Sequence, residues 1–126
     1  MKKTLQRVLY VEDDPDIQAV AVMALETVAG LTVEACSSGA EALAKGADFG
    51  PDLIVLDVMM PGMDGPTTLT ELRKLPPLAD TPVVFITAKT ANADLENLQA
   101  LGALSVITKP FDPMRLGEQL ASIWQQ

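Results

Sequence analysis

Five short apolar runs recur along the chain, and each is rich in β-branched residues. The runs are RVLYV at 7–11, LTVEAC at 31–36, DLIVL at 52–56, PVVFI at 82–86 and LSVIT at 104–108. Four of them are almost continuously apolar, whereas a strand with one face in solvent alternates apolar and polar residues. The pattern therefore predicts five strands of a parallel sheet that is covered on both faces.

The segments between these runs carry apolar residues at the spacing of an amphipathic helix. Five helices are expected, marked by Ile17, Val20, Ala21, Ala24 and Val28; by Leu43; by Leu69, Leu72 and Leu75; by Leu95, Leu98 and Leu101; and by Leu116, Leu120 and Ile123. Strands and helices alternate, and parallel crossovers are right-handed. The predicted fold class is α/β, a (βα)5 doubly wound open parallel five-stranded sheet. Because the sequence shows neither a linker nor a repeat, residues 1–126 are expected to form a single domain.

Residues typical of helix ends flank several of these segments. We expect an N-cap followed by proline at Asp14-Pro15 and at Asp112-Pro113, a capping box at Ser38 and Glu41, and C-terminal glycines at Gly30 and Gly102. These signals place the predicted helix boundaries within the connections between strands.

Composition narrows the chemistry that the chain can support. The chain has 126 residues, of which 48% are hydrophobic, enough for one domain with a real core. Its formal net charge of −8 disfavours direct binding to nucleic acid, which requires a basic surface. The absence of histidine excludes a serine or cysteine nucleophile activated by a histidine base, and it also excludes histidine-bound zinc. Any chemistry must therefore rest on carboxylates, a hydroxyl, a lysine or a hard metal ion.

Several features favour a cytoplasmic location without membrane contact. No apolar run approaches the roughly 20 residues that span a bilayer. The first residues, MKKTLQRVLYVEDD, lack the long apolar stretch and cleavage site of a secretory signal. The single Cys36 has no partner for an internal disulfide and is interpreted as a small buried hydrophobic residue.

Polar residues stand where four of the apolar runs end. Glu12, Asp13 and Asp14 follow the first run, Asp57 follows the third, Thr87 the fourth and Lys109 the fifth. In open α/β sheets, ligands bind outside the carboxyl ends of the strands, near the point where the strand order reverses. These side chains are therefore expected to converge on one edge of the sheet.

The residue types indicate phosphoryl chemistry at a metal site. Three carboxylates, from Glu12, Asp13 and Asp57, form a hard oxygen site of the kind that Mg²⁺ prefers. An ionised Asp57 is a usable nucleophile toward phosphorus and would give an aspartyl phosphate. Lys109 and the Thr87 hydroxyl would then hold phosphoryl oxygens.

Each of these residues also has an ordinary structural explanation when it is taken singly. An acidic triplet after a strand is usually a solvated turn, and Asp57 precedes a turn rich in proline and glycine. Thr87 alone would be read as an N-cap, and Lys109 alone as an exposed lysine. Their joint occurrence at four strand ends favours the functional interpretation.

Four segments of the chain resemble the signature segments of the response-regulator receiver domain of two-component signalling. They are VLYVEDD, LIVLDVMMPGMDG, VVFITA and SVITKPF, in that order, and the resemblance covers essentially the whole chain. It implies a flavodoxin-like strand order of 2-1-3-4-5.

The resemblance also implies a role for each matching residue. Asp57 would be the phosphoacceptor, Thr87 the switch hydroxyl, Ala88 the small side chain beside it and Lys109 the cationic partner. Mg²⁺ would be bound by Asp13 directly, by Glu12 mainly through water, by Asp57, and by Met59 through its backbone carbonyl. The Lys109-Pro110 peptide bond would be cis.

Two positions depart from the family pattern or vary within it. The family usually has Tyr or Phe three residues before the lysine, where this chain has Val106. The aromatic side chain that rotates inward in relatives is therefore missing at this position. Lys89, two residues after Thr87, is interpreted either as a solvated lysine or as one that leans over the pocket mouth.

The resemblance implies a signalling module that undergoes only self-catalysed phosphorylation and dephosphorylation and is not a conventional enzyme. Asp57 would accept a phosphoryl group from a phosphohistidine on a histidine kinase or phosphotransfer protein, and a downstream protein would read the changed surface. A Mg²⁺-dependent phosphohydrolase is the first alternative, although Met59 stands where such enzymes place a second Asp. A phosphorylation-independent pseudo-receiver is the second. A free-standing regulator and a receiver within a hybrid kinase both remain open.

Overall fold

A single five-stranded parallel sheet forms the centre of the molecule. The computed structural model describes residues 4–88 and 92–125. The strands are β1 (Arg7–Val11), β2 (Thr32–Cys36), β3 (Leu53–Asp57), β4 (Val83–Thr87) and β5 (Ser105–Thr108). Neighbouring strands pair in parallel in the order β2-β1-β3-β4-β5, which confirms the expected topology.

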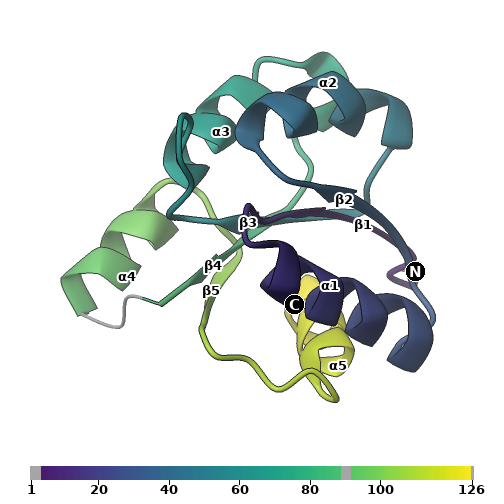
Figure 1. Cartoon of the computed structure of the whole chain (residues 1–126). Coiled ribbons are helices and arrows are strands. Elements are labelled where there is room, and N and C mark those ends of the chain that lie inside the picture. The colour runs from purple at the N-terminus through teal and green to yellow at the C-terminus, as the bar shows by residue number, and fades with distance from the viewer. Residues whose placement is uncertain (1–3, 89–91, 126) are drawn as a thin grey trace.

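Helices cover both faces of the sheet (Figure 1). The helical segments are α1 (Pro15–Met23), the π-helical η1 (Ala24–Val28), α2 (Gly39–Phe49), α3 (Gly65–Leu72), the 3₁₀ turn η2 (Pro76–Leu78), α4 (Asn92–Ala100) and α5 (Leu116–Trp124). Helices α2 and α3 lie on one face, and α1 and α5 lie on the other. The doubly wound arrangement predicted from the continuous apolar runs is confirmed.

Each face of the sheet has its own hydrophobic core, because successive strand side chains point to opposite faces. The α2–α3 core includes Leu9, Ile54, Leu72, Phe85 and Leu98. The α1–α5 core includes Val8, Tyr10, Leu25, Val55, Ile86 and Leu120. Every side chain of β3 and β4 is buried, as expected for the central strands of a covered sheet.

The first helix differs from the expected single amphipathic helix. Asp14 caps it as predicted, accepting hydrogen bonds from the amides of Asp16 and Ile17. The helix then widens into η1, where the Ala29 amide donates to the Ala24 carbonyl five residues earlier. Because a π turn adds a residue, the period changes, and Val28 on the predicted apolar face is 47% exposed.

The last helix begins later than the sequence predicts. Asp112 is not its N-cap, because α5 starts at Leu116. The Asp112 side chain instead accepts a hydrogen bond from the Met114 amide, and its carbonyl accepts one from the Arg115 amide. The amides of Met114 and Arg115 are therefore engaged in a local Asx turn, so residues 112–115 form a turn and not the first turn of a helix.

Smaller boundary differences occur elsewhere. The predicted capping box is formed with one change, because the Glu41 carboxylate accepts from the Ser37 amide while Ser38 Oγ accepts from the Glu41 amide. Helix α3 ends before Leu75. Strands β3 and β4 each end one residue later than expected, so Asp57 and Thr87 are the last residues of their strands.

At the edge of the sheet opposite these strand ends, Asp52 makes hydrogen bonds to two distant segments. Its carboxylate accepts hydrogen bonds from the amides of Gln6 and Arg7, each at 3.0 Å. Its carbonyl accepts one from the Trp124 indole at 3.1 Å. The start of β1 and the end of α5 therefore meet at one residue. None of the helices in residues 4–88 and 92–125 combines the length and the apolar character needed to cross a membrane.

Candidate functional site

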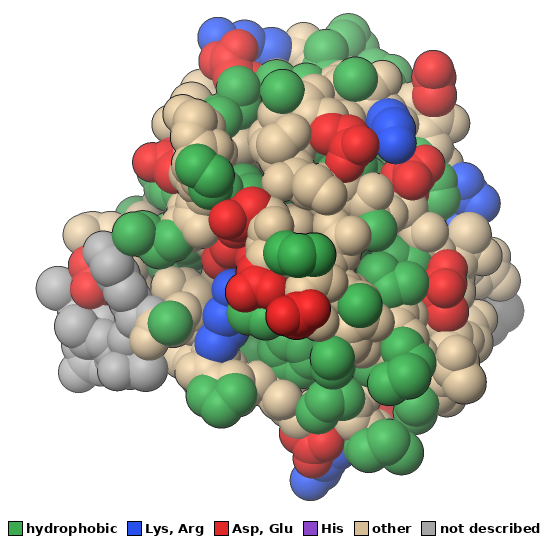
Figure 2. All heavy atoms as spheres, viewed as in Figure 1, with side chains coloured by type: hydrophobic (Ala, Val, Ile, Leu, Met, Phe, Trp, Pro, Cys, Tyr) green, Lys and Arg blue, Asp and Glu red, His purple; other side chains and the backbone are tan. Residues whose placement is uncertain are grey.

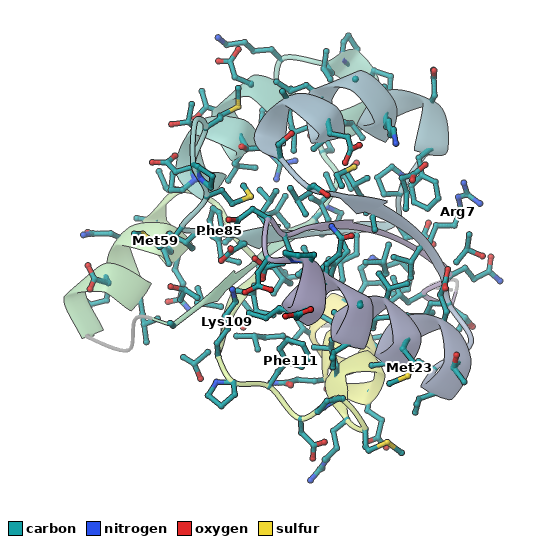
Figure 3. All side chains as sticks on the ribbon, in the orientation of Figure 1. Arg7, Met23, Met59, Phe85, Lys109 and Phe111 are labelled. Carbon is teal, nitrogen blue, oxygen red and sulfur yellow. The ribbon has the colours of Figure 1, made fainter. Side chains whose placement is uncertain are left out.

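The predicted site residues lie at the carboxyl edge of the sheet. Asp57 is in register with Ile86, next to Thr87, and the Lys109 amide donates to the Thr87 carbonyl at 2.7 Å. Glu12 directly follows β1, the other neighbour of β3. Figure 3 shows Lys109 between the end of the sheet and the start of α1. Segments far apart in the sequence thus converge here, as the strand-end pattern predicts.

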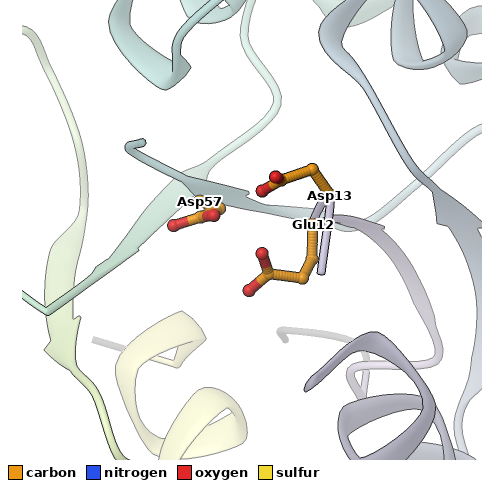
Figure 4. Close-up of side chains that lie close together, drawn as sticks. All are labelled: Glu12, Asp13 and Asp57. Carbon is orange, nitrogen blue, oxygen red and sulfur yellow. The ribbon is translucent and has the colours of Figure 1, made fainter. Parts of the chain in front are cut away.

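Three carboxylates form a compact cluster at this edge. One oxygen from each of Glu12, Asp13 and Asp57 lies within 4.8 Å of the other two. Figure 4 shows the three side chains turned toward a common space. Glu12 is 1% exposed and Asp57 is 3% exposed, so two of the acids are withheld from water. Oxygen donors at this spacing fit a hard divalent cation, and the cluster could hold one.

Lys109 provides positive charge at the edge of this cluster. Its Nζ lies 2.7 Å from Glu12 Oε1 and 3.2 Å from Asp57 Oδ1. The lysine is thus shared between two carboxylates of the cluster. Figure 2 shows red acidic side chains beside a blue basic one near the middle of this view. Three carboxylates against one ammonium leave the cluster with excess negative charge.

The burial of these groups shifts their proton affinities. Burial raises the pKa of Glu12, and the neighbouring Asp57 carboxyl raises it further, while Lys109 and the Asp14 amide lower it. For Lys109, burial lowers the pKa, but the two carboxylates outweigh burial and the pKa is raised. The lysine is therefore protonated at neutral pH, and an added cation would further favour the ionised form of Glu12.

Thr87 is buried at the end of β4, with 1% of its surface exposed, and the exposed Ala88 follows it. Its role as the switch hydroxyl stays a prediction. Lys89 lies outside the described residues. Val106 is half-buried and packs against the α2–α3 core. The Lys109-Pro110 bond is cis, as the resemblance implied.

The segment after β3 folds back closely on the strand. The Met59 side chain is 61% exposed and extends away from the core (Figure 3), so a role of this residue through its backbone carbonyl stays a prediction. The Gly65 amide donates to the Val58 carbonyl at 2.9 Å. A Cβ at position 65 would lie 2.5 Å from the Asp57 carbonyl oxygen, so glycine is required for this approach. The requirement depends on how closely the chain returns to the strand, which residue spacing does not indicate.

Comparison with known proteins decides the family. Residues 8–121 match the sequence profile described as the response regulator receiver domain. The chain belongs to this family. The chemotaxis protein CheY4 of Vibrio cholerae has a similar structure, with a TM-score of 0.87 and 32% identity over 94% of this chain and 98% of that chain. The receiver fold and the expected strand order are thereby confirmed.

Curated relatives of this receiver domain are longer proteins. A probable C4-dicarboxylate response regulator, DctR, of Halalkalibacterium halodurans is 34% identical over 91% of this chain and 50% of its own length. The sensor kinase CckA of Brucella abortus is 40% identical over 86% of this chain and 11% of its own length. The chain spans about half the length of the curated regulators that it matches.

A buried polar side chain of β1 lies close to the site, and the sequence pattern did not single it out. Tyr10 lies in β1, two residues before Glu12, and its side chain is fully buried. Burial raises the pKa of its phenol, and the charges of Glu12 and Asp57 raise it further, so the ring lies within electrostatic range of both acids. The available signal was a phenol in an otherwise apolar run, directly upstream of the acidic residues.

Proposed function

We propose that this receiver domain accepts a phosphoryl group on Asp57 from a phosphohistidine, in a reaction that requires Mg²⁺. The donor would be a histidine kinase or a phosphotransfer protein. The observation that carries the proposal is the position of Lys109 Nζ, 3.2 Å from Asp57 Oδ1 at the rim of a three-carboxylate cluster. A nucleophilic carboxylate, a cation and an oxygen-rich metal site are the parts that phosphoryl transfer requires.

Each residue has a distinct part in this chemistry. An Asp57 oxygen forms a bond to phosphorus while the bond between phosphorus and the donor imidazole nitrogen breaks. Lys109 and the Thr87 hydroxyl then meet phosphoryl oxygens. Mg²⁺, held by Glu12, Asp13, Asp57 and the Met59 carbonyl, would supply further neutralisation of phosphoryl charge when it is bound.

A partner protein would approach across the apolar surface beside Lys109. An open hollow of about 450 Å³ lies there, and Ile17, Val20, Pro110, Phe111 and Pro113 are among the residues that line it. Figure 3 shows Phe111 on this side, between α1 and α5. A surface of this kind would let a donor side chain reach the carboxylates while water is excluded around it.

The phosphoryl group would bias the domain between two arrangements, and a downstream protein would read the difference. We propose that the domain is a single unit over residues 1–126, acts in the cytoplasm, and catalyses no turnover beyond its own phosphorylation and dephosphorylation. Relatives include both a response regulator and a sensor kinase, so either context suits the chain.

Intact-mass measurement after incubation with acetyl phosphate tests the proposal. The protein should gain one phosphoryl group with Mg²⁺ and none with a chelator. Asp57→Asn should gain none, whereas Asp48→Asn, which alters an exposed acid on α2, should label as the wild type does. Equal labelling of the Asp57→Asn variant would overturn the assignment. Repeated turnover of a small phosphate ester would instead favour a phosphohydrolase, and no labelling in any variant would favour a pseudo-receiver.

A further inference from the structure

Two buried polar atoms near the site make no hydrogen bond within residues 4–88 and 92–125. They are the phenolic oxygen of Tyr10 and Oε1 of Glu12. Tyr10 belongs to the α1–α5 core, and Glu12 follows it by two residues, directly after the end of β1. Tyr10 is fully buried and Glu12 is 1% exposed. A buried phenol without a hydrogen bond is costly, and phenylalanine would fill nearly the same space without that cost.

Glu12 Oε1 depends on one cation. Lys109 Nζ lies 2.7 Å from it, while Oε2 accepts a hydrogen bond from the Asp14 amide at 3.2 Å. The nearby side-chain amide of Gln18 is already engaged, because its Nε2 donates to the carbonyls of Glu12 and Cys36 at 3.0 and 3.1 Å. The neutralisation of Oε1 therefore rests on Lys109.

Phosphorylation of Asp57 would remove this neutralisation. The phosphoryl group brings additional negative charge to the carboxylate that shares Lys109 with Glu12. As the ammonium turns to the phosphoryl oxygens, Glu12 Oε1 would lose its ion pair, and its stabilisation would then come from the bound Mg²⁺ and from any new hydrogen-bond donor. A new donor to Oε1 would stabilise the phosphorylated arrangement selectively.

We propose that Tyr10 is a positioning residue whose phenolic O–H hydrogen-bonds to Glu12 Oε1 when Lys109 engages the phosphoryl group. Glu12 then keeps its place in the metal site without the lysine. The hydroxyl has no such partner at rest, so its contribution belongs to the phosphorylated arrangement alone. This inference rests on the proposed function, because it assumes that Lys109 moves to a group on Asp57.

The chain has one tyrosine, which allows a direct test. Protein carrying ¹³C at the tyrosine Cζ is compared by NMR with and without Mg²⁺ and beryllofluoride, a phosphoryl mimic. The single Cζ resonance should move downfield when the mimic binds, because the phenol begins to donate to a carboxylate. In Lys109→Ala the resonance should already be displaced without the mimic, because Glu12 Oε1 has lost its cation. In Glu12→Ala the Cζ resonance should stay in place, both when beryllofluoride is added and when Lys109→Ala is combined with it, because the accepting carboxylate is absent.

The Lys109→Ala comparison needs no phosphoryl mimic. It therefore tests the role of Tyr10 separately from the proposed phosphorylation of Asp57. If beryllofluoride leaves the amide signals of Asp57 and Thr87 unchanged, the proposed function fails, and Lys109→Ala still tests Tyr10. If the mimic binds and the Cζ resonance stays fixed, the inference is wrong. It is equally wrong if the resonance of Lys109→Ala matches that of the wild type.

Tyr10→Phe tests the proposal through the affinity for beryllofluoride. A tyrosine that only packs in the core would not affect this affinity. The variant should bind Mg²⁺ as the wild type does and should be at least as stable, because no hydrogen bond is lost at rest and phenylalanine avoids the cost of an unpaired buried phenol. Its affinity for beryllofluoride should fall about tenfold, the effect of losing one hydrogen bond to a charged group. Trp124→Phe removes a polar tip from the same core at the opposite edge and should leave that affinity unchanged. Wild-type affinity in Tyr10→Phe would refute the proposal.

Discussion

Lys109 holds two carboxylates at once, so its removal should separate metal binding from the response to phosphorylation. Lys109→Ala removes a repelling cation from the metal site, and Mg²⁺ binding should be retained. The spectral change caused by phosphorylation should be mostly lost, because no ammonium remains to follow the phosphoryl oxygen. Amide NMR during titrations with Mg²⁺ and then beryllofluoride measures both effects.

The matched control for this prediction is Lys45→Ala. Lys45 is an exposed lysine on α2 that forms its ion pair with Glu41, at 3.4 Å, rather than with a carboxylate of the site. It should respond to both titrations as the wild type does. A full spectral response in Lys109→Ala would reduce Lys109 to an ordinary surface charge.

Glu12 should make the stability of the metal-free protein fall as the pH rises. Its pKa is raised above the ordinary 4.5, first by burial and then by Asp57, so the folded state binds its proton more tightly than the unfolded chain does. Stability from this group is therefore full below about pH 4.5 and is lost as the pH rises through the folded-state pKa. In chelator, Glu12→Gln should melt at a higher temperature than wild type at neutral pH.

The difference between the two melting curves should shrink as the pH is lowered, because the wild-type carboxyl then takes up a proton. Added Mg²⁺ should also reduce it, since a cation stabilises the ionised form. A Glu12→Gln variant that is less stable at neutral pH would show that the ion pair with Lys109 outweighs burial.

For individual residues, the sequence indicated which side chains lie at the site but not which of them contact one another. Residue types at strand ends indicated the carboxylates and Lys109, because parallel strands bring their carboxyl ends to one edge. The 2.7 Å approach of Lys109 to Glu12 depends on how far each side chain reaches, which strand positions do not specify. The Tyr10 hydroxyl was hidden for a similar reason, because an aromatic residue in a strand is ordinarily counted as core.

Strand β5 should move little when the domain is phosphorylated. Val106 packs against the α2–α3 core and is too short to exchange between pocket and solvent, and its χ1 angle is stiff. The chemical shift changes on binding beryllofluoride should therefore concentrate in the segment after Thr87. Changes spread equally over β5 and α5 would contradict this view and show that coupling survives without an aromatic residue.

The connection from β3 to α3 should be intolerant of any side chain at Gly65. In Gly65→Ala the new Cβ would meet the Asp57 carbonyl oxygen at 2.5 Å and Val58 Cα at 2.9 Å, both of which are backbone atoms that cannot turn aside. The variant should lose stability and, at temperatures where it is folded, should also phosphorylate more slowly, because Asp57 is displaced. Thermal unfolding and intact-mass time courses measure the two effects.

Gly117→Ala is the control, because its Cβ would collide with Ala29 at the contact between α5 and η1. It should lose stability but keep the phosphorylation rate of wild type while folded. If Gly65→Ala phosphorylates as fast as Gly117→Ala, the close approach at Gly65 matters only for folding.

The elements themselves were predictable wherever a local pattern was reinforced by burial. Continuous apolar runs identified all five strands to within one residue, because the central strands are covered on both faces. Boundaries were wrong where a local hydrogen bond competed with the helix, as at Asp112, whose side chain closes a turn. The widened turn at η1 was not predicted, because regular helical spacing was assumed to continue through Val28.

The molecule as a whole should protect Cys36 from chemical modification. The thiol is buried at the end of β2, and burial, followed by the charges of Glu41 and Glu34, raises its pKa to about 12. The thiolate is the reactive form, so a thiol reagent should label the native protein very slowly and label the unfolded protein at once. The labelling rate measured across a urea series should rise with the unfolding transition. Rapid labelling in the absence of urea would indicate that the β2 edge opens independently of the rest.

Asp52 brings the beginning and the end of the described chain together at the edge opposite the site, through Gln6 and Trp124. A polypeptide whose two extremities lie side by side is topologically almost a ring. The chain could therefore be circularly permuted, with a short linker between the two ends and new termini in an exposed connection. The carboxylates and the lysine would keep their places, because each is held by the end of its own strand. The order of the elements along the chain is thus separable from the chemistry that the fold assembles.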